Sequence, residues 1–133
     1  MPFYLDTSAF VKLIVSEPES RALRSWVKAR GAEFFASELL RVEALRTARR
    51  HSQKALLAAR EGLDAVTLVA VTTEICERAA ELDPSILRSL DAVHLATALS
   101  AGDRLEGVVA YDQRLGAACG AHGVPFEAPG QAS

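Results

Sequence analysis

Four acidic residues lie where a solvated surface charge is not expected. Asp6 directly follows the short apolar run PFYL, and Asp112 follows a second run, GVVAY. Glu43 and Asp91 lie within helical patterns that are otherwise largely apolar. Carboxylates gathered at one place repel one another and raise one another's pKa unless a cation neutralises them. Ligands that are all oxygen suit Mg²⁺ or Mn²⁺ better than zinc.

Each acid, taken alone, also has an ordinary structural explanation. Asp6 and Asp91 could cap helices, and Asp112 could form a turn. Glu43 could lie at the edge of a polar stripe on its helix. Caps and turns are the commoner use of a single Asp, so the hypothesis of a metal site depends on a fold that brings the four acids together.

The alternation of apolar patterns predicts such a fold. Short runs bounded by Gly, Asp, Ser or Thr predict strands at 2–5, 32–36, 65–71, 107–111 and 123–127. Longer stretches with apolar residues three and four apart predict helices at 8–15, 19–30, 37–51, 53–64, 73–83 and 89–101. Strands separated by helices pair in parallel through right-handed crossovers. We therefore expect an α/β three-layer sandwich in which a mostly parallel sheet of about five short strands is flanked by helices.

The carboxyl ends of parallel strands lie at one edge of a sheet, and ligands of open α/β sheets bind beyond that edge. Asp6 follows the first predicted strand, and Asp112 follows the fourth. Both acids are therefore expected at the same edge.

Length and composition limit the class of protein. The 133 residues, 50% of them hydrophobic, predict one globular domain over 1–133, with a poorly ordered tail from about residue 128. A formal net charge of −2 argues against a protein that coats nucleic acid through its overall charge, so any nucleic-acid site must be local. No apolar run approaches the roughly 20 residues of a spanning helix, so no membrane contact is expected.

The two cysteines, Cys76 and Cys119, lie far apart and in no Cys/His spacing that is typical of a zinc site. A disulfide framework is not indicated either. We expect a protein of the reducing cytoplasm.

Four motifs stand in a familiar order: YLDTSAFVKL, SELLRVEALR, LDAVHLATAL and VVAYDQRL. The sequence resembles the PIN-domain nucleases, and within them the VapC toxins of toxin–antitoxin pairs, from Met1 to about the last predicted strand. This resemblance implies a PIN-like fold and an endoribonuclease in which Asp6, Glu43, Asp91 and Asp112 bind Mg²⁺ or Mn²⁺ for hydrolysis of RNA phosphodiester bonds. It also implies a cognate antitoxin protein as a partner, and we expect a homodimer.

Residues beside the acids also match the family. Thr7 and Ser8 are either helix-capping residues or hydroxyls that position Asp6 or a bound water. His94 is expected in the core or behind the acids rather than as a metal ligand. Many family members carry Thr or Ser two positions before the fourth acid, where this chain has Ala110. This departure leaves open how Asp112 is oriented.

The stretch RTARRHSQK is the densest basic segment of the chain. Its cations Arg46, Arg49, Arg50 and Lys54 are candidates for RNA binding, and the alternative is a solvated helix end, where cations collect because of the helix dipole. The apolar run AFVKLIV and the helix that carries Trp26 either belong to the core or form a dimer face or a groove for the antitoxin.

Two other functions compete with a nuclease. A receiver-type phosphoacceptor domain also has acids at strand ends, but it needs a second acid beside the first and a lysine on its last strand. Here Asp6 stands alone, and no lysine follows Lys54. The second alternative is a catalytically weak PIN-like domain that binds RNA or a partner. The four acids argue against it, and Ala110 argues for it.

Overall fold

Five short parallel strands form the central sheet of the computed structural model, which describes residues 2–131. They are β1 (Pro2–Leu5), β2 (Glu33–Ser37), β3 (Thr67–Val69), β4 (Gly107–Val109) and β5 (Phe126–Glu127). The strands lie side by side in the order β3-β2-β1-β4-β5, and every pairing is parallel. The predicted α/β architecture is confirmed.

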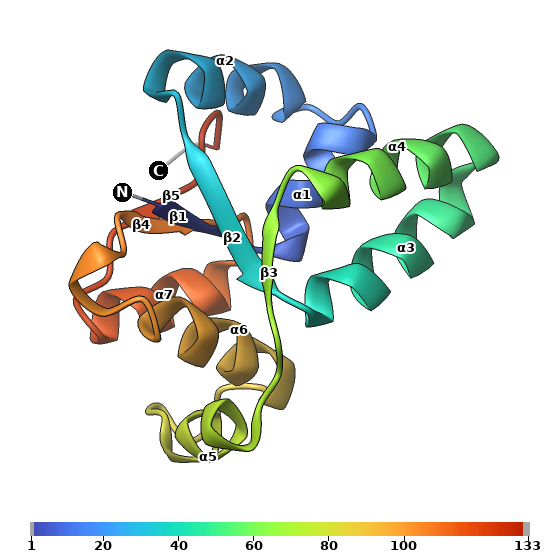
Figure 1. The fold of residues 1–133 in the computed structure, drawn as a ribbon. Helices are drawn as coiled ribbons and strands as arrows, with labels where there is room; N and C mark the ends of the chain where they lie inside the picture. The colour runs from blue at the N-terminus through green and yellow to red at the C-terminus, as the bar shows by residue number, and fades with distance from the viewer. Residues whose placement is uncertain (1, 132–133) are drawn as a thin grey trace.

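Helices cover both faces of this sheet (Figure 1). They are α1 (Thr7–Ile14), α2 (Ser20–Arg30), α3 (Leu39–His51), α4 (Gln53–Asp64), α5 (Thr73–Glu81), α6 (Ser89–Leu99) and α7 (Gln113–Ala121), with a 3₁₀ turn, η1 (Gly102–Arg104), before β4. The chain first moves outward from β1 to β3 and then returns to β4 and β5. Because crossovers are right-handed, this reversal places α1 to α4 on one face and α5 to α7 on the other.

Some element boundaries differ from the sequence-based expectation. The predicted strands 65–71, 107–111 and 123–127 are shorter in the structure, where they span 67–69, 107–109 and 126–127. Helix α7 was not predicted at all. Its glycines, Gly116 and Gly120, are poor helix formers, and its apolar spacing is short.

The core lies between the sheet and the helices on its two faces. Its largest fully buried side chains include Tyr4, Leu5, Phe10, Leu23, Leu40, Leu95, Leu115, Val108 and Val109. Helix α4 packs so closely on α1 that a Cβ added at Gly62 would lie 2.9 Å from Cζ of Phe10. The apolar run after Asp6 is therefore partly core, as Ala9 and Phe10 are buried while Leu13 and Ile14 are half-buried.

Strands β1 and β4 are neighbours, and their following helices lie on opposite faces of the sheet. This is the switch point at which open parallel sheets bind ligands. Asp6 and Asp112 follow these two strands and therefore lie beside that crevice.

Within residues 2–131, no helix is both long enough and apolar enough to cross a membrane. Of the tail that was predicted to be poorly ordered, residues 132–133 lie outside the described part of the chain. The Tyr111 hydroxyl donates to the carbonyl oxygen of Pro129 at 2.7 Å. Poor order of the tail and the single-domain boundary stay predictions.

Candidate active site

Asp6 both begins α1 and presents an oxygen to the crevice. Its Oδ2 accepts hydrogen bonds from the backbone N–H of Ser8 at 3.1 Å and from Ser8 Oγ at 2.6 Å. Ser8 Oγ accepts in turn from the backbone N–H of Tyr111 at 2.9 Å, which links the end of β1 to the segment after β4. Because both bonds use Oδ2, Oδ1 of this buried side chain remains available to a ligand. Helix capping and metal binding are therefore compatible at Asp6.

Glu43 points from α3 toward α1 and α6. Its Oε1 accepts from Thr7 Oγ1 at 2.6 Å and is 2.8 Å from Nε2 of His94. Burial alone would raise the pKa of Glu43, but the hydrogen bonds with His94 and Thr7 outweigh it and hold the pKa below its usual value. Glu43 is therefore ionised at neutral pH and is not the edge of a solvated stripe.

His94 lies behind the acids and is almost fully buried. Its Nε2 is 3.8 Å from Oδ1 of Asp6, too far for a hydrogen bond but close enough for electrostatic attraction. Burial would lower the pKa of His94, but the hydrogen bond with Glu43 and the charges of Asp6 and Asp91 raise it. The imidazole is thus hydrogen-bonded to Glu43 and lies close to Asp6 without a hydrogen bond to it.

Asp91 lies in the first turn of α6, three residues before His94, so the two side chains share one face of the helix. It is not the N-cap, which is Arg88. Burial raises the pKa of Asp91, and the charges of Asp112 and Asp6 raise it further. The charges of Asp6 and Asp112, which follow two neighbouring strands, therefore act on Asp91 at the switch point.

Asp112 is the N-cap of α7, not the turn residue that was the alternative. Its Oδ1 accepts from the backbone N–H groups of Arg114 at 2.8 Å and Leu115 at 3.3 Å. Ala110 is fully buried, and its backbone N–H donates to the carbonyl oxygen of Glu127 at 3.1 Å. The start of α7 therefore orients Asp112, and no hydroxyl at position 110 is needed for this.

The donor set fits a divalent cation. All four predicted ligands offer carboxylate oxygens, which Mg²⁺ and Mn²⁺ prefer. As the side chains stand, no three His, Cys, Asp or Glu residues among 2–131 converge closely enough to hold one ion. Burial raises the pKa of Asp91, and the negative charges of Asp112 and Asp6 raise it further because like charges repel. A cation between these carboxylates would relieve that repulsion.

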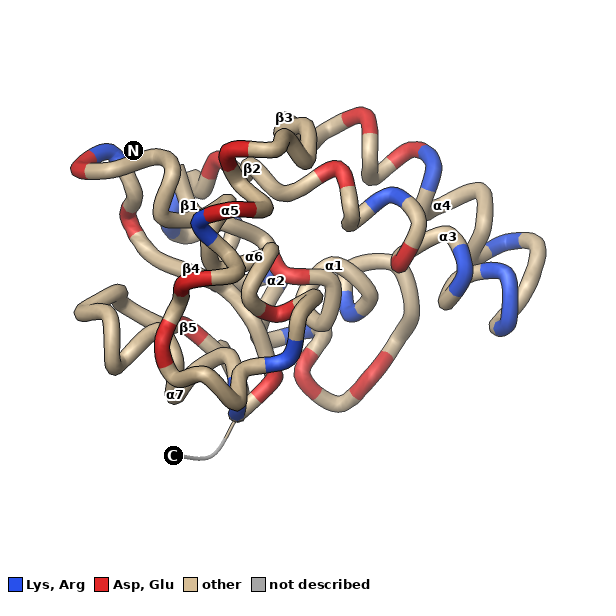
Figure 2. The backbone as a smooth tube through the Cα atoms, turned by 90° about the horizontal axis from the view of Figure 1, so that it is seen from below, with Lys and Arg blue, Asp and Glu red and all other residues tan. Residues whose placement is uncertain are grey.

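The predicted RNA-binding cations lie apart from the acids. Arg46, Arg49, Arg50 and Lys54 are exposed at the end of α3 and the start of α4, where basic residues gather (Figure 2). The three arginines line one shallow pocket of the surface. At 1.5 Å per residue, Arg50 lies about 10 Å farther along α3 than Glu43. The structure therefore places the three arginines on the helix of Glu43 and Lys54 on the next helix, α4, all of them apart from the acids.

Tyr4 is a site residue that the sequence analysis missed. Its hydroxyl is 2.6 Å from Nδ1 of His94, although the two residues are 90 positions apart. A tyrosine within an apolar strand has the pattern of a core residue, so nothing in the sequence distinguishes it from its neighbours.

Comparison with known proteins identifies the family to which this chain is similar. The model of the PIN domain family matches residues 3–120. Ribonuclease VapC47 of Mycobacterium tuberculosis is 39% identical over 131 residues, which cover 96% of each chain. Ribonuclease VapC35 of the same species is 42% identical over 132 residues, which cover 97% of this chain and 98% of that protein.

Solved structures share the fold at lower sequence identity. The crystal structure of Mycobacterium tuberculosis VapC20, described as a sarcin–ricin loop cleaving toxin, superposes with a TM-score of 0.70 at 21% identity and covers 87% of this chain and 94% of that one. A toxin–antitoxin complex from Klebsiella pneumoniae gives a TM-score of 0.68 at 20% identity, over 84% of this chain and 87% of that one.

Proposed function

The chain belongs to the PIN-domain family and, within it, to the VapC ribonucleases, and on this premise we propose that it is a metal-dependent endoribonuclease and the toxin of a toxin–antitoxin pair. Its substrate is RNA, and its cofactor is Mg²⁺ or Mn²⁺. Its place of action is the cytoplasm, where Cys76 and Cys119 remain free thiols.

Asp6, Asp91 and Asp112 bind the metal in this proposal, and Glu43 either joins them or orients the attacking water. A divalent cation held by these oxygens would supply the Lewis acidity that hydrolysis of a phosphodiester needs, by polarising the phosphate and making a water more acidic. The protein contributes fixed positions. Ser8 holds Asp6, the start of α7 holds Asp112, and Thr7 with His94 holds Glu43.

The observation that carries the proposal is the placement of Asp91 beside the switch point between β1 and β4, where the charges of Asp112 and Asp6 act on it. Asp6 and Asp112 each cap a helix that begins at this edge, so their closeness alone has a structural explanation. Asp91 caps no helix, and its pKa is raised by burial and by Asp112 and Asp6. A half-buried acid whose pKa is shifted by neighbouring charges at a crevice indicates a functional site.

Cleavage of a structured RNA in the presence of Mn²⁺ tests the proposal. The variants Asp6→Asn and Asp91→Asn should each lose cleavage while they keep the wild-type circular dichroism spectrum. Asp103→Asn is the matched control, because Asp103 is exposed on η1 and its variant should cleave like the wild type. Wild-type turnover by both Asp6→Asn and Asp91→Asn would refute the metal site.

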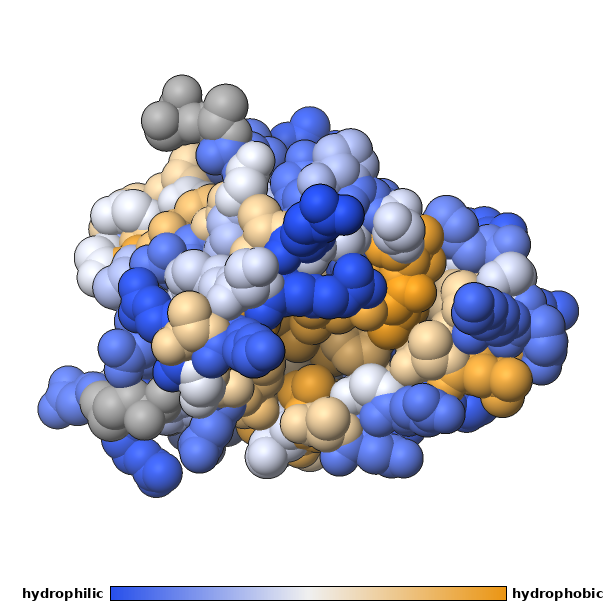
Figure 3. Space-filling view, turned by 90° about the horizontal axis from the view of Figure 1, so that it is seen from above, coloured by the Kyte–Doolittle hydropathy of each residue, from blue (hydrophilic) through white to orange (hydrophobic). Residues whose placement is uncertain are grey.

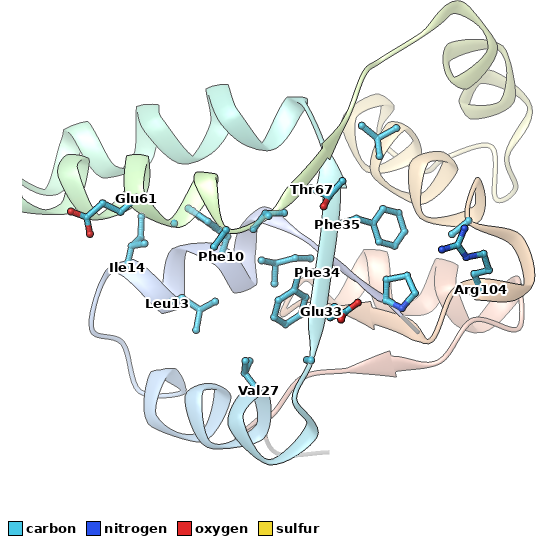
Figure 4. A pocket seen from close by; sticks show the side chains of 18 of the residues that line it. Phe10, Leu13, Ile14, Val27, Glu33, Phe34, Phe35, Glu61, Thr67 and Arg104 are labelled. Atoms are coloured by element: carbon cyan, nitrogen blue, oxygen red, sulfur yellow. The ribbon is translucent and has the colours of Figure 1, made fainter.

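An apolar groove on the α1–α4 side supports the proposed antitoxin partner. It has a volume of about 1220 Å³ and lies between α1, α2, α4 and β2. Phe10, Leu13, Ile14, Val27 and Phe34 face it (Figure 4), and a hollow with apolar side chains is visible on the surface in Figure 3. An amphipathic segment of a small partner protein would bury such a surface.

Coexpression with the product of the neighbouring gene tests this groove. The partner should copurify and suppress cleavage, and Leu13→Asp with Val27→Asp should release active enzyme. Both side chains are half-exposed, whereas Phe10 is buried and its replacement by Asp would disrupt the core. Leu57→Asp is the control, because Leu57 is 57% exposed on α4 and does not line the groove. If the variant with Leu13→Asp and Val27→Asp still forms an inhibited complex, the partner binds at another surface.

A homodimer is the second proposed assembly. Exposed apolar side chains outside the groove support it, among them Ile86 at 88% exposure and Leu90 at 52%. Large apolar side chains in water favour association. Light scattering on the purified chain should give twice the monomer mass, and a monomer at micromolar concentration would contradict it.

A further inference from the structure

A buried chain of hydrogen bonds leads from the middle of the sheet to the acidic site. The backbone N–H of Ser37 on β2 donates to the Tyr4 oxygen at 3.1 Å. The same oxygen is 2.6 Å from Nδ1 of His94, and Nε2 of His94 is 2.8 Å from Oε1 of Glu43. Tyr4 and Ser37 are fully buried, and His94 is nearly so.

The positions of the hydrogens in this series of hydrogen bonds follow from what each group can donate. The Ser37 N–H can only donate, so the Tyr4 oxygen accepts there. The phenol hydrogen is then directed at the other neighbour, Nδ1 of His94. An imidazole that accepts at Nδ1 and is neutral carries its hydrogen on Nε2. Nε2 therefore donates to Glu43.

The opposite arrangement leaves a buried group unsatisfied. If Nδ1 carried a hydrogen, the Tyr4 oxygen would accept from both Ser37 and His94, and its own hydrogen would have no acceptor among residues 2–131. A buried O–H without a partner is costly. The nearby acids favour a second hydrogen on the His94 ring, at Nδ1. The phenol hydrogen of Tyr4, which points at Nδ1, opposes it. Burial raises the pKa of Tyr4, so the phenol retains that hydrogen at neutral pH.

These hydrogen bonds determine which carboxylate oxygen of Glu43 is available to a ligand. Thr7 and His94 both bond to Oε1. No donor within the described chain is bonded to Oε2, so this oxygen is available to a cation or a water. A ring flip of His94 would remove one of the two donors that hold the carboxylate in this orientation.

We propose that Tyr4 is a positioning residue of the site, whose hydroxyl holds the His94 ring so that Nε2 donates to Glu43. The inference rests on the proposed nuclease function only for its effect on turnover, because the hydrogen-bond chain itself can be measured without substrate or metal. Tyr4 acts through His94 and touches no reacting atom.

Nitrogen NMR on metal-free protein labelled with ¹⁵N-histidine tests the hydrogen-bond chain. In weakly alkaline solution, His94 should show a protonated Nε2 and an Nδ1 with the shift of a hydrogen-bonded acceptor. Tyr4→Phe should move Nδ1 toward the shift of a free acceptor. Tyr111→Phe removes the other phenol hydroxyl, which donates to Pro129, and should leave the His94 shifts unchanged. A protonated Nδ1 in the wild type, or no change in Tyr4→Phe, would overturn the proposal whether or not the protein cleaves RNA.

A double-mutant cycle tests the positioning role in turnover. Tyr4→Phe should lower kcat about tenfold, with KM for RNA unchanged, as expected for a group that orients a site residue. His94→Gln supplies an amide N–H that can reach Glu43 without a donor from Tyr4. In that background, Tyr4→Phe should change kcat by less than about twofold, because the two residues act as one unit. An equal loss in both backgrounds would mean that Tyr4 serves only the fold. Absence of cleavage by the wild type would instead count against the proposed function.

Discussion

The acidic site and the basic end of the α3–α4 hairpin differ in how firmly their charged side chains are held. The basic end consists of Arg46, Arg49, Arg50 and Lys54. Asp6 is buried and accepts two hydrogen bonds, and Glu43 is bonded to both α1 and α6. At the basic end, Arg46 and Arg49 are exposed, and none of the residues described there forms an ion pair with them. Chemistry at a phosphate requires fixed positions, whereas attraction of a polyanion requires only nearby charge.

The largest expected difference between the two regions is in how the losses of RNA cleavage caused by single substitutions combine in a double variant. Asp6→Asn and Asp91→Asn should each reduce RNA cleavage by roughly 10⁴-fold, and the double variant should be no worse, because groups that act as a unit fail together. Single-turnover cleavage at saturating Mn²⁺ measures this. Independent losses that multiply in the double variant would show that the two acids do not share one site.

At the basic end the effects should be graded. Replacement of Arg46, Arg49 and Arg50 by Gln should weaken RNA binding, and the slope of log affinity against log salt should fall by about 0.7 for each phosphate that the protein no longer neutralises. Cleavage at saturating RNA should remain. Filter binding over a salt series measures the slope. The same substitutions at Arg21, Arg24 and Lys28, on α2, are the control. An unchanged slope would make the basic end a solvated helix terminus.

Stability should also distinguish the two regions. Burial and then the charges of Asp112 and Asp6 raise the pKa of Asp91, so its ionised form costs stability at neutral pH. Asp91→Asn should therefore raise Tm in chelator by a few degrees. The gain should vanish in acid, below the unfolded pKa, where the carboxyl is protonated in both states. Asp103→Asn, which removes an exposed carboxylate on η1, is the matched control.

Metal should reverse this order of stability. Mn²⁺ at a hundredfold excess over its dissociation constant should stabilise the wild type by about 2.7 kcal/mol and Asp91→Asn by much less. Thermal melts of both proteins over a Mn²⁺ series measure the two gains. Equal gains would mean that Asp91 is no ligand.

The smallest effect is expected at Ala110. Because the start of α7 already orients Asp112, Ala110→Ser should change cleavage by less than about threefold, well below the roughly 10 to 100-fold effect of removing a supporting residue. Steady-state cleavage rates of the two proteins are sufficient. A large gain would show that the missing hydroxyl limits this enzyme.

The sequence predicted the parts of the molecule that depend on local pattern. Strand ends and helix periodicity placed Asp6 and Asp112 at one edge of a parallel sheet, and the structure has this arrangement. Helix α7 escaped because Gly116 and Gly120 weaken its local signal, while its cap and its packing against β5 support it. The contact of Tyr4 with His94 also escaped, because it joins residues 90 positions apart.

Cleavage of a structured RNA by the wild-type chain, measured from chelator to saturating Mn²⁺, tests the proposed metal dependence most directly. We expect no cleavage in chelator, a rate that rises and saturates with Mn²⁺, and no response to Mn²⁺ in Asp6→Asn. Undiminished cleavage by the wild type in chelator would contradict the metal site.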